Sequence, residues 1–168
     1  MPRLFLDGVT DITPGMLENL GIKTLALDVD NTLAPPKSMI PFDGVLEWIG
    51  NMQANGIALF IVSNAKKRRV EPFANSLGLS FTSLALKPFP FCFSRAAKSA
   101  GVKKKEIAMV GDQVFTDMIS ANTAGVYSLL VRLKVSESHW SYKFKRRFEV
   151  NVINRYHKKE KNHRKDDI

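Results

Sequence analysis

The sequence is poor in cysteine and in long apolar runs, and both shortages restrict what the protein can be. Cys92 is the single cysteine among 168 residues, so an internal disulfide framework is excluded, and no His/Cys cluster has zinc-ligand spacing. The longest uncharged run, residues 48–65, contains asparagine, glutamine and glycine and is too polar to span a bilayer. Residues 4–6 are too short a run for the apolar core of a signal peptide. These absences predict a cytoplasmic protein without a transmembrane segment.

The composition is that of a globular domain whose positive charge is unevenly placed. With 45% apolar and 24% charged residues, the chain is neither disordered nor fibrous. The net charge is +9, and residues 132–168 carry 12 basic against 5 acidic residues, whereas residues 1–131 carry 13 against 11. We therefore expect a body in which basic and acidic residues are nearly balanced, and a basic C-terminal segment that binds an anion.

Short apolar runs alternate with amphipathic segments along the chain. Strands are predicted at residues 24–29, 57–62, 81–84, 107–110 and 126–131. Helices are predicted at 42–54, in the segment that ends at Leu77, at 91–100 and at 117–124. Thr13 and Pro14 are typical of a helix start, and Pro72 must lie in the first turn of its helix or kink it. The alternation predicts an α/β fold with a parallel sheet and helices on both faces.

Asp28 and Asp30 directly follow the first buried strand and are the strongest chemical signal. Two carboxylates at this spacing can reach one crevice and suit metal binding, nucleophilic attack or proton donation. The alternative is a solvated turn at the end of a strand, where aspartate is common.

Polar residues also follow the later strands: Ser63 and Asn64, then Lys87, then Asp112 and Asp117. Because parallel strands end at one edge of a sheet, these side chains should converge on a single pocket. Carboxylates, a hydroxyl and a lysine around one pocket suit Mg²⁺ and a phosphate.

With these motifs in order, roughly residues 10 to 155 resemble the haloacid dehalogenase superfamily of phosphotransferases. The resemblance implies a Rossmann-like fold and a Mg²⁺-dependent phosphatase. It implies that Asp28 is the nucleophile that takes the phosphoryl group. Asp30 would protonate the leaving group, activate water and bind Mg²⁺ through its main-chain carbonyl.

The same resemblance implies the remaining roles. Ser63 and Asn64 would hold the phosphoryl oxygens, and Lys87 would balance the charge on Asp28 and on the phosphate. Asp112 and Asp117 would complete the Mg²⁺ site with Asp28 and Asp30, Asp117 either directly or through water.

The spacing between the motifs leaves no room for a cap domain. Residues 31–62 and 65–86 are largely used by the predicted helices and strands. A capless site is open, which favours hydrolysis and allows a large substrate. Residues 1–135 are therefore predicted to form a capless phosphatase domain with a short N-terminal extension.

Two basic runs lie in this domain. Residues 66–69 should lie at the active edge, where they either attract an anionic substrate or form a solvated helix start. Residues 103–105 precede a strand and should face solvent at the opposite edge.

The C-terminal segment 136–156 places an aromatic or apolar residue at every fourth position, among basic residues: Trp140, Phe144, Phe148, Val152 and Tyr156. This pattern is typical of a helix that lies on anionic lipid, and equally of a last helix packed on the body. Contact with nucleic acid is a third, less favoured interpretation. Residues 157–168 are polar and predicted to be disordered.

Further details narrow the resemblance to the YqeG-like branch of subclass IIIA. They are the short body, the pattern from Gly111 to Asp117, the Lys87-Pro88 pair and the basic aromatic tail. The branch is similar to mitochondrial phosphatidylglycerophosphate phosphatases, which implies hydrolysis of phosphatidylglycerophosphate to phosphatidylglycerol at the inner face of a membrane. The rival hypotheses are a phosphatase for a soluble ester, a phosphoprotein or a nucleic-acid end, and a non-catalytic scaffold. The sequence leaves the oligomeric state open.

Overall fold

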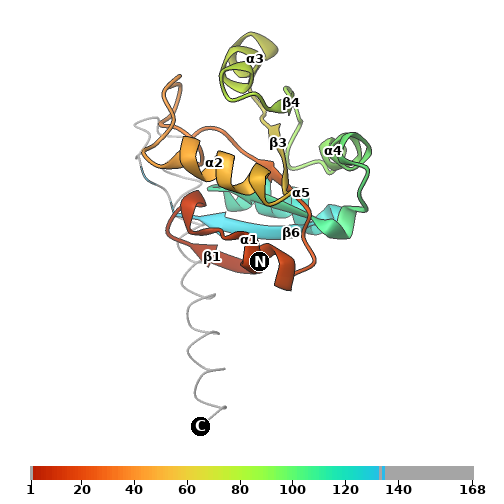
Figure 1. Ribbon diagram of the computed structural model, residues 1–168. Coiled ribbons are helices and arrows are strands. Elements are labelled where there is room, and N and C mark those ends of the chain that lie inside the picture. The colour runs from red at the N-terminus through yellow and green to blue at the C-terminus, as the bar shows by residue number, and fades with distance from the viewer. Residues whose placement is uncertain (1, 133, 135–168) are drawn as a thin grey trace.

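Six short segments pair into one parallel sheet with the strand order β1-β6-β5-β2-β3-β4. The strands are β1 (Leu4–Leu6), β2 (Thr24–Leu27), β3 (Ala58–Val62), β4 (Ser80–Thr82), β5 (Ile107–Gly111) and β6 (Tyr127–Val131). The computed structural model describes residues 2–132 and 134 (Figure 1). The right-handed twist of parallel strands turns β3 across β6, as Figure 1 shows.

Alternate residues of the central strands supply two separate hydrophobic cores. In β2, Leu25 and Leu27 face one core and Ala26 faces the other. In β3, Leu59 and Ile61 share the first core, and Phe60 and Val62 share the second. Because both faces of these strands are apolar, each face must be covered by helices.

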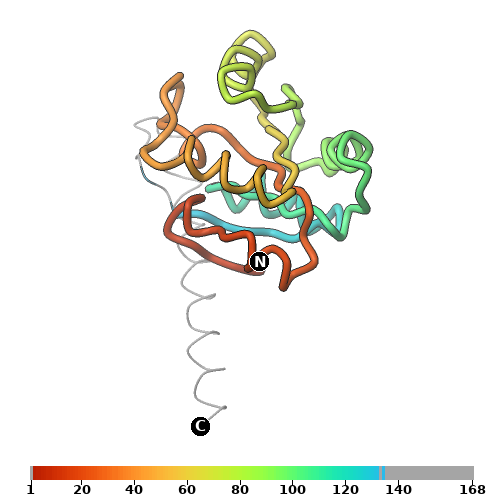
Figure 2. Tube along the Cα trace, viewed as in Figure 1, coloured from red at the N-terminus to blue at the C-terminus, as the bar shows by residue number. Residues whose placement is uncertain are grey.

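Helices cover both faces, as the alternation predicts. The first core is completed by α1 (Pro14–Asn19), α2 (Val45–Ala54) and α3 (Lys67–Ser76), and the second by α4 (Cys92–Ala100) and α5 (Ile119–Ala124). Figure 2 shows α2 and α4 on opposite sides of β3. Short 3₁₀ turns, η1 (Val9–Asp11) and η2 (Lys104–Glu106), precede α1 and β5. The predicted Rossmann-like fold is confirmed, and no cap domain is inserted within residues 2–132.

Most predicted elements are present, with three differences. The first strand, β1, was not predicted, because its three residues carry too little pattern. Pro72 is the sixth residue of α3 and not in its first turn, so the first-turn alternative was wrong. The predicted helix 117–124 begins instead as a π-helix, η3 (Val114–Met118), which continues as α5. At Thr13 the prediction is confirmed, since its hydroxyl accepts a hydrogen bond from the Met16 N–H at 3.2 Å.

The strand order places a topological switch point between β2 and β5. The chain runs from β2 to β3 and β4 on one side, and then returns to β5 and β6 on the other side. In open α/β sheets, ligands bind beside the carboxyl ends of the strands at such a point. Asp28 follows β2 and Asp112 follows β5, so both aspartates lie there.

Among the described residues, no helix combines the length and the apolar character needed to cross a membrane. Residues 136–168, on which the predicted basic aromatic helix and polar tail fall, lie outside the described residues.

Candidate active site

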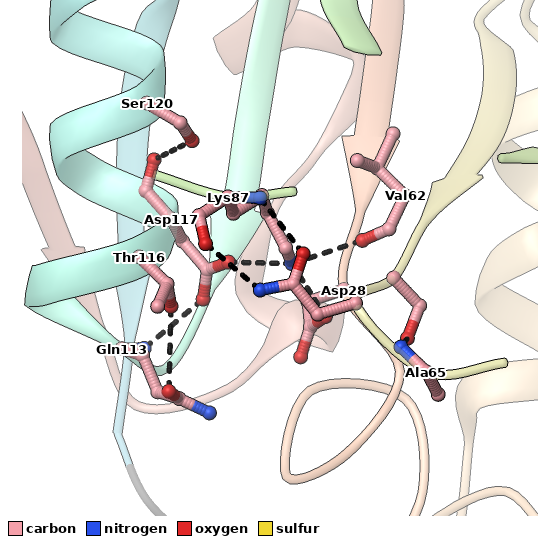
Figure 3. A network of polar contacts seen from close by, with 10 residues as sticks. Asp28, Val62, Ala65, Lys87, Gln113, Thr116, Asp117 and Ser120 are labelled. Carbon is pink, nitrogen blue, oxygen red and sulfur yellow. Dashed lines mark hydrogen bonds and ion pairs between the residues drawn. The ribbon is translucent and has the colours of Figure 1, made fainter. Parts of the chain in front are cut away.

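Lys87 joins two of the predicted acids in the centre of the site (Figure 3). Its ammonium lies 2.6 Å from Asp28 Oδ1 and 2.6 Å from Asp117 Oδ1, and it donates to the Val62 carbonyl at 2.9 Å. The Lys87 side chain is only 3% exposed. Three segments that lie far apart in the sequence are therefore tied together by one buried cation.

Asn64 fixes the backbone from which Lys87 projects. Its side-chain amide donates to the Lys87 carbonyl at 2.9 Å and accepts from the Lys87 N–H at 2.8 Å. Nearby, the Ala85 N–H donates to the Ser63 carbonyl at 3.0 Å. Asn64 thus positions Lys87, and its predicted contact with a phosphate stays a prediction.

Ser63 lies at the end of β3 and is buried. Its Oγ accepts a hydrogen bond from the Ala65 N–H at 3.2 Å. In this contact the hydroxyl is only an acceptor, so its proton can be donated to a ligand.

Asp117 is held in place by the turn after β5. The Gln113 N–H donates to Asp117 Oδ2 at 3.1 Å, and Thr116 Oγ1 donates to Gln113 Oε1 at 3.3 Å (Figure 3). A Cβ atom at Gly111 would collide with the Asp117 carboxylate, so this position needs glycine for space. The π-helix and the glycine together bring Asp117 against the end of β5, a use of π-turns that is frequent at functional sites.

Burial and charge shift the pKa values of the Asp28–Lys87 pair. Burial raises the pKa of Asp28 to about 7, although Lys87 lowers it, and the charges of Asp117 and Asp30 raise it further. Burial disfavours the charged form of Lys87, but the carboxylates of Asp117 and Asp28 more than offset this and raise its pKa above the ordinary value. Lys87 is therefore a permanent cation beside a carboxylate whose ionisation is costly.

Three buried carboxylates form a group that fits a metal ion. Ligand atoms of Asp28, Asp112 and Asp117 all lie within 4.8 Å of one another. Lys87 supplies one positive charge against three carboxylates, so a divalent cation would offset the remainder. Oxygen ligands of this kind suit Mg²⁺.

The Asp30 side chain lies outside this carboxylate group. Its Oδ1 accepts from the Lys37 N–H at 2.9 Å and from the Arg69 guanidinium at 3.2 Å. The same guanidinium donates to the Ser38 carbonyl at 2.9 Å. Arg69 thus links α3 to the loop after β2 and to Asp30. The predicted role of the Asp30 carbonyl as a metal ligand stays a prediction.

Sequence reasoning missed the role of Arg69. The basic run 66–69 predicts either an attraction for an anionic substrate or a solvated helix start, and neither alternative includes a contact with Asp30. The other three residues of the run are exposed, whereas Arg69 is partly buried. Helical spacing was the available signal, since Arg69 lies four residues before the buried Phe73 and therefore on the same side of α3.

Cys92 and the second basic run are explained by their burial and exposure. Cys92 is buried in the second core, and burial raises the pKa of its thiol, so it is a packing residue. Residues 103–105 precede β5 at the opposite edge and are exposed.

Comparisons with known proteins agree with this geometry. The sequence pattern described as "Hydrolase: haloacid dehalogenase-like hydrolase" matches residues 37–125. "Probable phosphatase YqeG" of Bacillus subtilis is 32% identical over 153 residues, which cover 91% of this chain and 89% of that protein.

Solved structures share the fold. NagD from Escherichia coli superposes with a TM-score of 0.56 at 12% identity, over 69% of this chain and 90% of that one. The cobalt-bound deoxy-D-mannose-octulosonate 8-phosphate phosphatase from Haemophilus influenzae gives a TM-score of 0.50 at 19% identity, over 69% and 80% of the two chains.

Proposed function

Because the chain belongs to the haloacid dehalogenase-like hydrolase family, we propose that it is a Mg²⁺-dependent phosphatase that acts through a phosphorylated Asp28. The observation that carries this proposal is the buried Lys87 ammonium, 2.6 Å from both Asp28 and Asp117 at the switch point of the sheet. A desolvated cation fixed between carboxylates is preorganised to receive a phosphate dianion.

Asp28 is the nucleophile in this proposal. Lys87 engages its Oδ1, and no hydrogen bond within the described part of the chain engages Oδ2. Oδ2 attacks phosphorus, the bond from phosphorus to the leaving oxygen breaks, and an acyl phosphate forms on Asp28. Water then attacks phosphorus and releases inorganic phosphate, which restores the carboxylate.

Asp30 is the general acid and base. It protonates the leaving oxygen in the first step and takes a proton from water in the second. Its carboxylate is partly exposed and is held from one side by Arg69. These contacts let it face a leaving group at the open edge of the sheet.

Ser63, Asn64 and Lys87 bind the transferred phosphoryl group. The Ser63 hydroxyl and the Lys87 ammonium are donors on buried side chains, where a hydrogen bond to an anion is strong. Asn64 acts mainly by holding the Lys87 backbone.

Asp28, Asp112 and Asp117, with the main-chain carbonyl of Asp30, would hold Mg²⁺. The bound ion would supply positive charge that offsets the charge of the phosphoryl oxygens.

The proposed substrate is phosphatidylglycerophosphate, cleaved to phosphatidylglycerol at the cytoplasmic face of a membrane. The absence of a cap domain from residues 2–132 supports it, and the resemblance of the sequence to the branch that is similar to phosphatidylglycerophosphate phosphatases implies it. The Bacillus subtilis relative is named as a probable phosphatase, so the similarity to it supports the phosphatase activity and not the lipid. An uncapped site admits a phosphate whose remaining atoms stay outside the pocket. The alternative is a soluble phosphate ester, a phosphoprotein or a nucleic-acid end.

A phosphatase screen with Mg²⁺ tests both the proposed metal-dependent activity and the proposed lipid substrate. Phosphatidylglycerophosphate in mixed micelles, small phosphate esters and 5′-phosphorylated RNA are compared at equal phosphate concentration. We expect release of phosphate that a chelator abolishes and Mg²⁺ restores, with the highest kcat/KM for the lipid. A preference for RNA or for a small ester would reject the lipid substrate, and chelator-resistant hydrolysis would reject the metal site.

The metal site has a second readout. Mg²⁺ should raise the Tm of the protein, because it binds the folded state selectively. The shift should be lost in Asp112→Asn, and a shift that persists there would contradict the proposed ligand set.

A further inference from the structure

Large apolar side chains are exposed in two loops at the carboxyl edge of the sheet. We call them the apolar rim: Met39 and Ile40 after β2, and Leu84, Leu86, Phe89 and Phe91 between β4 and α4. Ile40 is 76% exposed and Phe91 is 71% exposed. A group of exposed apolar residues in one region is a common mark of an interaction surface, whereas single ones are ordinary.

The backbone of the loop after β4 turns its leucines outward. Leu84 and Leu86 are exposed, whereas Ala85 and Lys87 between and after them are buried. Both leucines have positive φ angles, 48° and 57°, which residues with a side chain rarely adopt. The loop thus buries a lysine and exposes leucines, the reverse of the usual preference.

Contacts join both loops of the rim to the candidate active site. The Leu84 N–H donates to the Ala65 carbonyl at 3.0 Å, beside Ser63. Arg69 reaches the other loop through the Ser38 carbonyl and through Met39 Sδ at 3.6 Å. The rings of Phe89 and Phe91 stack with centroids 6.2 Å apart, two and four residues after Lys87. The rim therefore borders the site.

Exposed basic residues stand at the same edge. Lys66 and Arg68 lie at the start of α3. In the sequence they stand between Ala65, which contacts the loop of Leu84, and Arg69, which contacts the loop of Met39. Within the described part of the chain, no acidic side chain forms an ion pair with Lys66 or Arg68. Lys67 beside them pairs with Glu71 at 3.2 Å. Apolar side chains with unneutralised cations are the combination that binds an anionic bilayer.

We propose that the apolar rim docks the open edge of the site onto an anionic lipid bilayer, with Lys66 and Arg68 on the headgroups. The inference rests on the proposed phosphatase and deepens it by specifying a phosphate presented at a membrane surface. Asp28 is only 6% exposed, so a phosphate that remains attached to a bilayer lipid reaches it only if this edge faces the bilayer.

Vesicle binding of the full chain tests the proposal without any substrate. Phosphatidylcholine vesicles with and without phosphatidylglycerol are titrated, and bound protein is measured by flotation. The variant pair Phe89→Ser/Phe91→Ser should weaken binding by at least about tenfold. Lys66→Gln/Arg68→Gln should weaken it by up to about thirtyfold at low salt and by less at high salt.

Matched controls lie at the opposite edge. Leu20 ends α1 before β2 and is exposed, and Lys104 and Lys105 precede β5. Leu20→Ser removes an exposed apolar side chain, and Lys104→Gln/Lys105→Gln removes two exposed charges, but at the edge of the sheet opposite to the docked face. These controls should therefore leave vesicle binding within about twofold.

Equal binding by the rim variants and the controls would overturn the proposal. So would binding that is lost only when Lys143, Arg146 and Arg147 of the C-terminal segment are neutralised. Hydrolysis of a small soluble ester is measured in parallel and should not change in Phe89→Ser/Phe91→Ser. If no ester or lipid is hydrolysed while vesicle binding still depends on the rim, the proposed function fails and the docking surface stands.

Discussion

At the amino edge of the sheet, helices end at glycines with positive φ, whereas the described non-glycine residues with positive φ all lie at the carboxyl edge. Gly101 and Gly125 follow α4 and α5 in the left-handed conformation, where glycine pays no steric cost. Among the described residues, the non-glycine positions with positive φ are Asn31, Lys37, Leu84 and Leu86, all in loops at the carboxyl edge.

Charge differs between the edges in the same way. At the amino edge, Lys23 and Glu106 form a surface pair at 2.7 Å in which the lysine is exposed, and such pairs contribute little to stability. At the carboxyl edge, Lys87 and its two acids are buried. Backbone strain and buried charge both cost stability. Because both are concentrated at the carboxyl edge, this edge is the functional one.

The largest effect is expected at Asp28. Asp28→Asn keeps the shape of the side chain but removes the proposed nucleophile, so turnover should fall by about 10⁶-fold, as when other covalent nucleophiles are removed. Circular dichroism should show an unchanged fold. Full activity in this variant would end the phosphorylated-aspartate mechanism.

Asp30→Asn should lower turnover by about 10²- to 10⁴-fold, the usual contribution of a general acid–base residue. The loss should be smaller for an ester whose leaving group is already a weak base, because that group needs no proton. Rates with an alkyl and a nitrophenyl phosphate make this comparison. Equal losses would remove Asp30 from the acid role.

Lys87→Ala should lower turnover by about 10²- to 10³-fold, since it removes a preorganised charge. It should also destabilise the protein by about 3–5 kcal/mol, because two buried carboxylates lose their partner. Urea denaturation and the binding of vanadate measure the two effects. Unchanged vanadate affinity would show that Lys87 does not face the phosphate.

Arg69→Ala should lower turnover by about tenfold, because Asp30 loses a charge-assisted hydrogen bond that holds it. Arg69 is a positioning residue that acts through Asp30. The loss of turnover should therefore depend on the leaving group as it does in Asp30→Asn, and it should be larger for the alkyl ester than for the nitrophenyl ester. Arg69→Lys should recover part of the activity. A loss that is the same for both esters would indicate a purely structural contact with the Ser38 loop.

The smallest effect is expected at the amino edge. Gly125→Ala places a side chain in the left-handed region and should cost about 1 kcal/mol of stability. Turnover by the folded variant should be unchanged, because the strain lies far from the site. A loss of activity larger than the loss of folded protein would show that the two edges are coupled.

The sequence by itself determined the sheet, apart from the short strand β1, and the identity of its polar strand ends. Apolar runs and glycine stops are local signals, and parallel pairing brings the residues after β2, β3, β4 and β5 to one edge. Asp28, Lys87, Asp112 and Asp117 could therefore be brought together from sequence, and the structure joins them within one network.

Only the tertiary structure decided how that edge is supported and what surrounds it. Arg69 contacts Asp30 across 39 residues, and Asn64 holds Lys87 across 23, through helix phase and loop path that no local pattern encodes. The exposure of Leu84 and Leu86 follows from positive φ angles, which a run of apolar residues does not predict. Apolar residues read alone suggest a core, and only the folded backbone shows which of them face outward.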